Sequence, residues 1–127
     1  MDKKILIYLP AVITPPALQT ARHIVDGGQL YAVEILTFQE IFSKVPMDEA
    51  EDVKNAYRKL NQLGEQLDVP TENQLVEIGN PGQHLISLIK KLETNILVTS
   101  EMRASQLSKA NSEFIEKIPC KIIKIPL

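Results

Sequence analysis

Residues 76–100, VEIGNPGQHLISLIKKLETNILVTS, contain the pattern that decides the fold. The strand-like run Gln74–Ile78 leads into a turn, in which Asn80 is a good helix cap and Pro81 suits the first helical position. An apolar stripe at helical spacing follows: Leu85, Leu88, Ile89 and Leu92. The segment Asn95–Thr99 is again a short apolar run, typical of a buried strand. A helix between two such strands predicts a parallel pair, because parallel strands need a crossover connection.

The remainder of the chain repeats this alternation of strands and helices. Strands are expected at Lys4–Leu9, Leu30–Phe38, Gln74–Ile78, Asn95–Thr99 and Cys120–Ile125. Helices are expected from Pro15 to the Gly27-Gly28 pair, from Met47 to Leu67, from Pro81 to Leu92, and from Leu107 to Ile118. Right-handed crossovers then predict a single domain over residues 1–127. Its fold class is α/β, with one doubly wound, open parallel sheet and helices on both faces.

Composition narrows the class of protein further. A length of 127 residues with 44% hydrophobic and 24% charged residues is ordinary for one globular domain. A net charge of −2 argues against a nucleic-acid partner or an anionic membrane surface held by bulk charge. One cysteine excludes an intrachain disulfide, and no apolar run approaches the roughly 18 residues of a membrane span. We therefore expect a cytoplasmic protein without membrane insertion.

Ligands of such sheets bind beyond the carboxyl ends of the strands, which directs attention to four loops. These are Pro10–Thr14, Leu36–Gln39, Gly79–Gly82 and Thr99–Ser108. The first loop has neither a GxxxxGK phosphate cradle nor the glycines of a dinucleotide fingerprint. No acidic residue ends the first or the third strand, which disfavours a phospho-accepting receiver domain.

No residue of the sequence stands out as a catalytic nucleophile or base. His23 and His84 both fall within predicted helices, without a second histidine or cysteine at metal-ligand spacing. Cys120 follows Pro119 at the start of a predicted strand and suits a small buried hydrophobe. We therefore expect neither enzymatic activity nor a metal site.

Hydroxyl and basic side chains do gather after the fourth strand. Thr99, Ser100, Arg103 and Ser108 could contact a phosphate or a ribose, with the arginine supplying charge. The hydroxyl groups could equally cap a helix. Both readings remain open at the level of sequence.

Four segments of the chain together resemble the universal stress protein family. They are KKILIYL at 3–9, LYAVEI at 30–35, the quoted stretch at 76–100, and IPCKIIKIPL at 118–127. The resemblance implies strand order 3-2-1-4-5 and a homodimer joined along the fifth strand. The implied dimer interface is formed by Ile122, Ile123, Lys124 and Ile125. An edge strand of this kind must be covered, blunted or paired, which is compatible with self-pairing.

The family has a branch that binds ATP, and this sequence departs from its motif. The branch carries an aspartate just after the first strand, where this chain has Pro10, and the residue whose backbone would face adenine is Ile35. It also carries G-x2-G-x9-G-(S/T) after the fourth strand. The first two of these glycines correspond here to Ser100 and Arg103. Counting back from Pro119-Cys120 places the closing pair at Ser108-Lys109, so that this loop is five residues shorter than the motif, with four residues instead of nine between the second glycine position and the closing pair. The five glycines of the chain all precede residue 83.

The resemblance and these departures together define two functional hypotheses. The first is a non-enzymatic universal stress-type protein, a homodimer that acts in stress response through protein interactions, with no cofactor and without tight ATP binding. The alternative is a small-molecule or nucleotide-binding module for ATP or AMP, with its pocket at the carboxyl ends of strands 1 and 4. The residues of this pocket would be Pro10, Ile35, Thr99, Ser100, Arg103 and Ser108.

Overall fold

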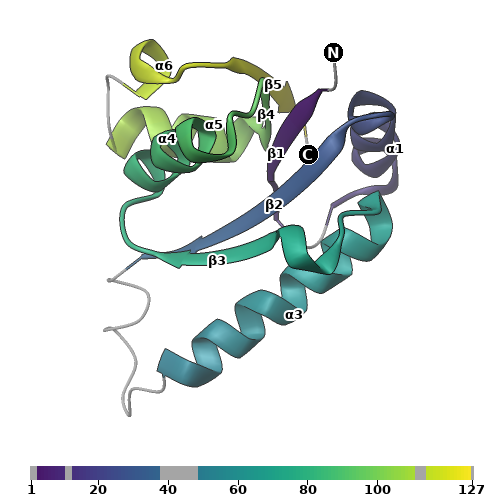
Figure 1. Ribbon diagram of the computed structural model, residues 1–127, viewed down its shortest axis with the longest axis horizontal. Helices are drawn as coiled ribbons and strands as arrows, with labels where there is room; N and C mark the ends of the chain where they lie inside the picture. Colours follow the sequence, from purple (N-terminus) through teal and green to yellow (C-terminus); the bar gives the residue numbers. More distant parts are fainter. Residues whose placement is uncertain (1–2, 11–12, 38–48, 111–113, 127) are drawn as a thin grey trace.

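The computed structural model describes residues 3–10, 13–37, 49–110 and 114–126, and the elements alternate along the chain as expected (Figure 1). The strands are β1 (Lys4–Tyr8), β2 (Gln29–Leu36), β3 (Gln74–Ile78), β4 (Ile96–Ser100) and β5 (Lys121–Ile125). The helices are α1 (Pro15–Val25), α3 (Glu49–Leu67), η1 (Thr71–Asn73, a 3-10 turn), α4 (Pro81–Leu92), α5 (Glu101–Ala110) and α6 (Phe114–Lys117).

The five strands form one sheet in the order β3-β2-β1-β4-β5, and every neighbouring pair is parallel. The predicted α/β class and strand order are thereby confirmed. The central strand β1 pairs Ile7 with Ala32 of β2 and with Val98 of β4. Because all strands run the same way, their carboxyl ends meet at one edge of the sheet.

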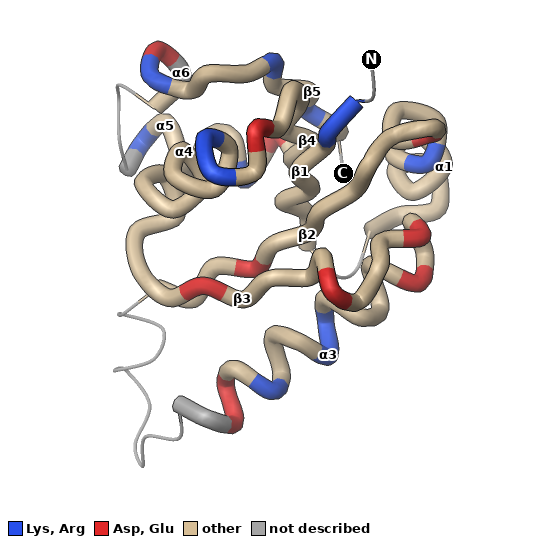
Figure 2. The backbone as a smooth tube through the Cα atoms, viewed as in Figure 1, with Lys and Arg blue, Asp and Glu red and all other residues tan. Residues whose placement is uncertain are grey.

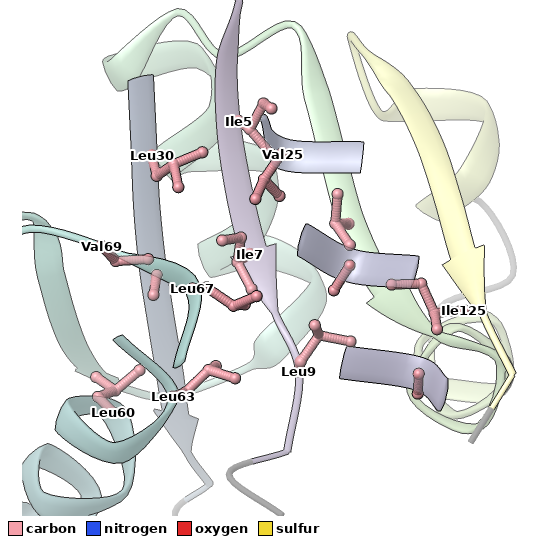
Figure 3. Close-up of a cluster of buried hydrophobic side chains, with 14 residues drawn as sticks. Ile5, Ile7, Leu9, Val25, Leu30, Leu60, Leu63, Leu67, Val69 and Ile125 are labelled. Carbon is pink, nitrogen blue, oxygen red and sulfur yellow. The ribbon is translucent and has the colours of Figure 1, made fainter. Parts of the chain in front are cut away.

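Helices cover both faces of the sheet, and each face has its own hydrophobic core (Figure 1). On one face, shown in Figure 3, the buried side chains of α1 and α3 pack on the sheet: Ala17, Ala21, Val25, Leu60, Leu63 and Leu67 against Ile5, Ile7, Leu30 and Val98. On the other face α4, α5 and α6 contribute Leu85, Leu88, Leu107 and Phe114, which lie against Leu6, Val33 and Leu97. Alternate residues of β1 therefore enter different cores, as strand geometry requires.

The predicted starts of two helices are confirmed by their caps. The Thr14 hydroxyl accepts a hydrogen bond from the Ala17 amide at 3.4 Å at the start of α1. The Asn80 side chain accepts one from the Gln83 amide at 3.0 Å at the start of α4. Each cap satisfies a helical N–H group that has no partner within its own helix.

The described beginning of α3 is acidic and its middle is basic, and its last turn has no basic residue. Figure 2 shows acidic residues near the described beginning of this helix and basic residues further along, which are Glu51 and Asp52 followed by Lys54, Arg58 and Lys59. Negative charge near a helix N-terminus is favoured by the helix dipole. No helix in the described part of the chain combines the length and apolar character needed to cross a membrane.

The sequence prediction was wrong about the segment after the fourth strand. A loop was expected over Thr99–Ser108, with a helix around Leu107 to Ile118. Instead β4 continues to Ser100 and α5 begins at the very next residue, and residues Phe114–Lys117 form the short helix α6. Polar residues in the first turns of α5 hide its periodicity in the sequence. The predicted strand end at Phe38 and helix start at Met47 lie outside the described residues.

Candidate ligand site at the carboxyl ends of the strands

The junction between β4 and α5 places Ser100 at the carboxyl edge of the sheet, beside the end of the central strand β1. Ser100 is buried, and its hydroxyl oxygen accepts a hydrogen bond from the Arg103 backbone N–H at 3.1 Å. This is the geometry of a helix cap. One of the two readings left open by the sequence, a helix cap, therefore describes what Ser100 does in this structure.

Thr99 connects the ends of the two central strands. The residue is 1% exposed, and its hydroxyl donates a hydrogen bond to the backbone oxygen of Tyr8 at 2.9 Å. Thr99 and Tyr8 are also direct neighbours in the register of β4 and β1. The Thr99 hydroxyl therefore makes its donor hydrogen bond within the sheet, at the last residue of β1.

Arg103 reaches from the first turn of α5 to β2. Its Nη2 lies 3.3 Å from Oε2 and 3.4 Å from Oε1 of Glu34, and its guanidinium carbon lies 4.3 Å from the centroid of the Tyr8 ring. The side chains of Arg103 and Glu34 are only 19% and 16% exposed. A cation stacked on a ring and paired with a carboxylate is well compensated for its burial.

One nitrogen of this guanidinium remains without a partner. Nη1 of Arg103 is buried and makes no hydrogen bond with any described residue. Buried polar groups are normally hydrogen-bonded, so an orphan donor on a charged group is unusual. The Arg103–Glu34 pair therefore uses only part of the donor capacity of the arginine.

The structure brings three of the predicted pocket residues together and places the others around them. Thr99, Ser100 and Arg103 meet at the carboxyl ends of β4 and β1. Pro10 is half-buried just beyond β1, and Ile35 is buried in the core under α4 and α5. Ser108 is half-buried about two helical turns into α5.

Sequence reasoning missed Tyr8 and Glu34, the two partners of Arg103. A signal for Glu34 was present, because a carboxylate stands within the otherwise apolar run LYAVEIL of β2. A half-buried acid in a strand normally needs a cation or several donors. The sequence does not show which cation pairs with Glu34, because Arg103 is 69 residues away and the two meet only through the strand order.

The histidines and the cysteine lie apart from this cluster or serve packing. His23 is exposed, whereas the His84 imidazole lies where a Cβ on Gly79 would be. Cys120 is half-buried against the core under α4 and α5. Burial raises the pKa of its thiol, and a backbone hydrogen bond involving Leu97 lowers the pKa by less. Among the described residues, no group of three or more metal-ligating side chains is present.

An open groove lies elsewhere, between the end of α3 and the start of β3. Its lining includes Asn61, Glu65, Asp68 and Gln74. Gly64 also lines it, and the Gln74 amide occupies the place of a Cβ on that glycine. This groove is lined by none of the residues that gather around Arg103.

The predicted dimer edge is β5, which pairs with β4 on one side in the described part of the chain. The Lys121 amide donates to the Asn95 backbone oxygen at 3.1 Å, toward β4. Since backbone groups of alternate residues point to opposite sides of a strand, Ile122 and Lys124 direct theirs to the open edge. The side chains of Ile123 and Ile125 pack into the α1/α3 core, and Ile122 packs on the opposite face.

Comparison with known proteins gives matches at the level of structure. Neither a protein-family model nor a curated protein matches this sequence. The solved structure of hypothetical protein MJ0577 matches with a TM-score of 0.73 and 14% identity, covering 100% of this chain and 97% of that one. A universal stress protein family member from Burkholderia pseudomallei matches with a TM-score of 0.63 and 14% identity, covering 98% and 96%.

A third match was solved with a ligand. The universal stress protein from Archaeoglobus fulgidus, in complex with dAMP, matches with a TM-score of 0.62 and 13% identity, covering 98% of this chain and 99% of that one. These matches extend over nearly the full length of both chains. The chain is thus a domain with the fold of the universal stress proteins, as its sequence resemblance predicted.

Proposed function

We propose that this chain is a universal stress-type protein that binds no nucleotide tightly and acts as a cytoplasmic homodimer, through protein interactions and not as an enzyme. The observation that carries the nucleotide part of the proposal is the ion pair of Arg103 and Glu34, with the guanidinium stacked on Tyr8. It lies at the edge of the sheet where this fold class binds ligands. The side chains best suited to hold a phosphate there, those of Thr99, Ser100 and Arg103, already have hydrogen-bond partners within the chain.

Three polar groups at this edge are used within the chain. The charge of Arg103 is opposed by the Glu34 carboxylate, the Thr99 proton is donated to Tyr8, and the Ser100 oxygen accepts from the first turn of α5. A nucleotide phosphate would have to displace a carboxylate that is tethered beside the guanidinium. An intramolecular partner has a high effective concentration, so this competition favours the closed pair.

The backbone at this edge also argues against tight nucleotide binding. A loop that wraps its N–H groups around phosphates needs glycine where side chains would clash or where φ is positive. Here α5 starts directly after β4, and no glycine follows Gly82 in the sequence. At the start of α5, the Arg103 backbone N–H donates to the Ser100 hydroxyl oxygen.

Calorimetric titration of the purified protein with ATP and AMP tests the nucleotide part of the proposal. We expect no saturable heat at micromolar protein concentration. Binding with micromolar affinity and a defined stoichiometry would overturn it. Titration of dAMP into the Archaeoglobus fulgidus protein, which was solved in complex with it, is the positive control.

The homodimer is tested at the open edge of β5. Lys124→Pro removes an N–H that points away from β4, whereas Lys124→Ala keeps it. If two copies pair along this edge, light scattering gives the mass of two chains for the parent protein and for Lys124→Ala, and the mass of one chain for Lys124→Pro. A monomer in all three samples would contradict edge pairing.

The second candidate function is a nucleotide-binding module, and one observation favours it. Arg103 Nη1 is buried without a partner, and the dAMP complex belongs to a protein of the same fold. Under this alternative ATP or AMP binds the parent protein and Arg103→Ala abolishes the binding. The same calorimetric titration therefore distinguishes the two candidates.

A further inference from the structure

Among the described residues, Arg103 forms an ion pair with Glu34 alone. The carboxylate reaches the guanidinium through Nη2 alone, at 3.3 and 3.4 Å. Charge-assisted bonds of arginine to oxyanions are strongest when two nitrogens engage two oxygens in parallel. The pair thus neutralises Arg103 without saturating it.

The unpartnered Nη1 of Arg103 indicates which class of ligand could bind here. Nη1 is buried and unpartnered, while the guanidinium face lies on Tyr8 and its chain is held by the α5 start under the Ser100 cap. The guanidinium is therefore held in place with one nitrogen unpartnered, and the planar guanidinium fork matches the geometry of phosphate oxygens once Glu34 releases Nη2. The positive charge of Arg103 is not free for an external anion, because it is already paired with the Glu34 carboxylate.

We propose that Glu34 is the specificity-determining residue of this edge, an internal anion that closes the site to phosphate-class ligands. The inference rests on the proposed function, in which the parent protein binds no nucleotide tightly. Replacing Glu34 by glutamine keeps the shape of the side chain and removes its charge. Arg103 then keeps its position but loses its counter-ion, so a phosphate group becomes the partner of the guanidinium.

The experiment measures thermal unfolding of three proteins with and without two probes, inorganic phosphate and AMP. The proteins are the parent, Glu34→Gln, and the double variant Glu34→Gln/Arg103→Gln. Every sample is matched in ionic strength with KCl, because general screening also changes melting temperatures. Ligand at roughly ten times its Kd is expected to raise the melting temperature of Glu34→Gln by about 5 °C.

The parent and the double variant are expected to show no such increase. A response of Glu34→Gln to phosphate and AMP alike identifies the phosphate group as the recognised part, and a response to AMP alone identifies a nucleotide. If Glu34→Gln is unfolded without ligand, recovery of its helical circular dichroism on addition of either probe supports the proposal.

Two results would overturn the inference. One is a Glu34→Gln protein that responds to neither probe, whether it is folded or unfolded at the start. The other is an equal response of the double variant, because the bound anion would then not depend on Arg103. Micromolar AMP binding by the parent protein is a different result, since it removes the proposed function and with it the need for a closing residue.

Discussion

The crossing from β3 to α4 and the crossing from β4 to α5 start helices at the same edge of the sheet by different means. After β3, Gly79 takes a φ of 145°, and exposed Asn80 caps the helix. After β4 there is no connecting residue, and the cap is buried Ser100, the last residue of the strand. Each helix start has a side-chain cap, but only the first follows a glycine.

The difference decides what lies over the edge of the sheet. A glycine turn leaves a space beside the backbone, which the His84 imidazole fills at the β3 crossing. A direct junction brings the first turn of a helix over the central strands, so that Arg103 covers Tyr8 and meets Glu34. At the β4 crossing, the carboxyl edge of the sheet is thus covered by an internal ion pair.

The largest effect is expected from breaking the ion pair. Glu34→Ala leaves a mostly buried cation without its partner, which should lower the free energy of unfolding by about 3 kcal/mol. Arg103→Met should cost a similar amount, and the double variant should cost less than the two changes added together. Urea unfolding of all four proteins gives the coupling energy, and simple additivity would show that the pair is not coupled.

A smaller loss is expected at the glycine of the β3 crossing. Gly79→Ala forces a side chain into a φ of 145° and against the His84 ring, and should lower stability by about 2 kcal/mol. The double variant Gly79→Ala/His84→Ala removes the contact and leaves the backbone strain. If thermal unfolding shows that the double variant recovers the whole loss, the strained backbone is not the cause.

The two caps offer a matched pair with a smaller effect still. Ser100→Ala and Asn80→Ala each remove one side-chain acceptor from a helix start and should cost about 1 kcal/mol. Ser100→Ala should be the more costly, because the N–H it leaves is part-buried whereas water reaches the exposed Asn80 cap. Equal losses in chemical denaturation would mean that burial at the β4 junction adds nothing.

The smallest effect concerns Cys120, which lies away from both crossings. Burial raises the pKa of its thiol, so less thiolate is present near neutral pH and alkylation should be slower than for an exposed cysteine. The rate should rise at higher pH as the thiolate forms. An alkylation rate equal to that of a short cysteine peptide at pH 8 would contradict this. Applied to Glu34→Ala, the same assay shows whether that substitution makes Cys120 more accessible.

The alternation of elements was predictable because it depends on near neighbours. The Thr14 and Asn80 caps, the apolar stripe of α4 and the bounds of β3 all depend on residues within a few positions of one another. The order of the strands needed the family resemblance as well, since several doubly wound topologies share one pattern. The start of α5 escaped prediction because its first turns carry too few apolar residues to show a period.

The sequence by itself thus determined the class of the domain, the order of its helices and strands, and the lack of glycine after residue 82. Only the tertiary structure decided how Arg103 is used. Its partner Glu34 lies 69 residues away and its ring partner Tyr8 lies on a third element, and they meet because the sheet places β2, β1 and β4 side by side. Local periodicity carries no information about such a contact, since it depends on strand order and on the reach of one long side chain.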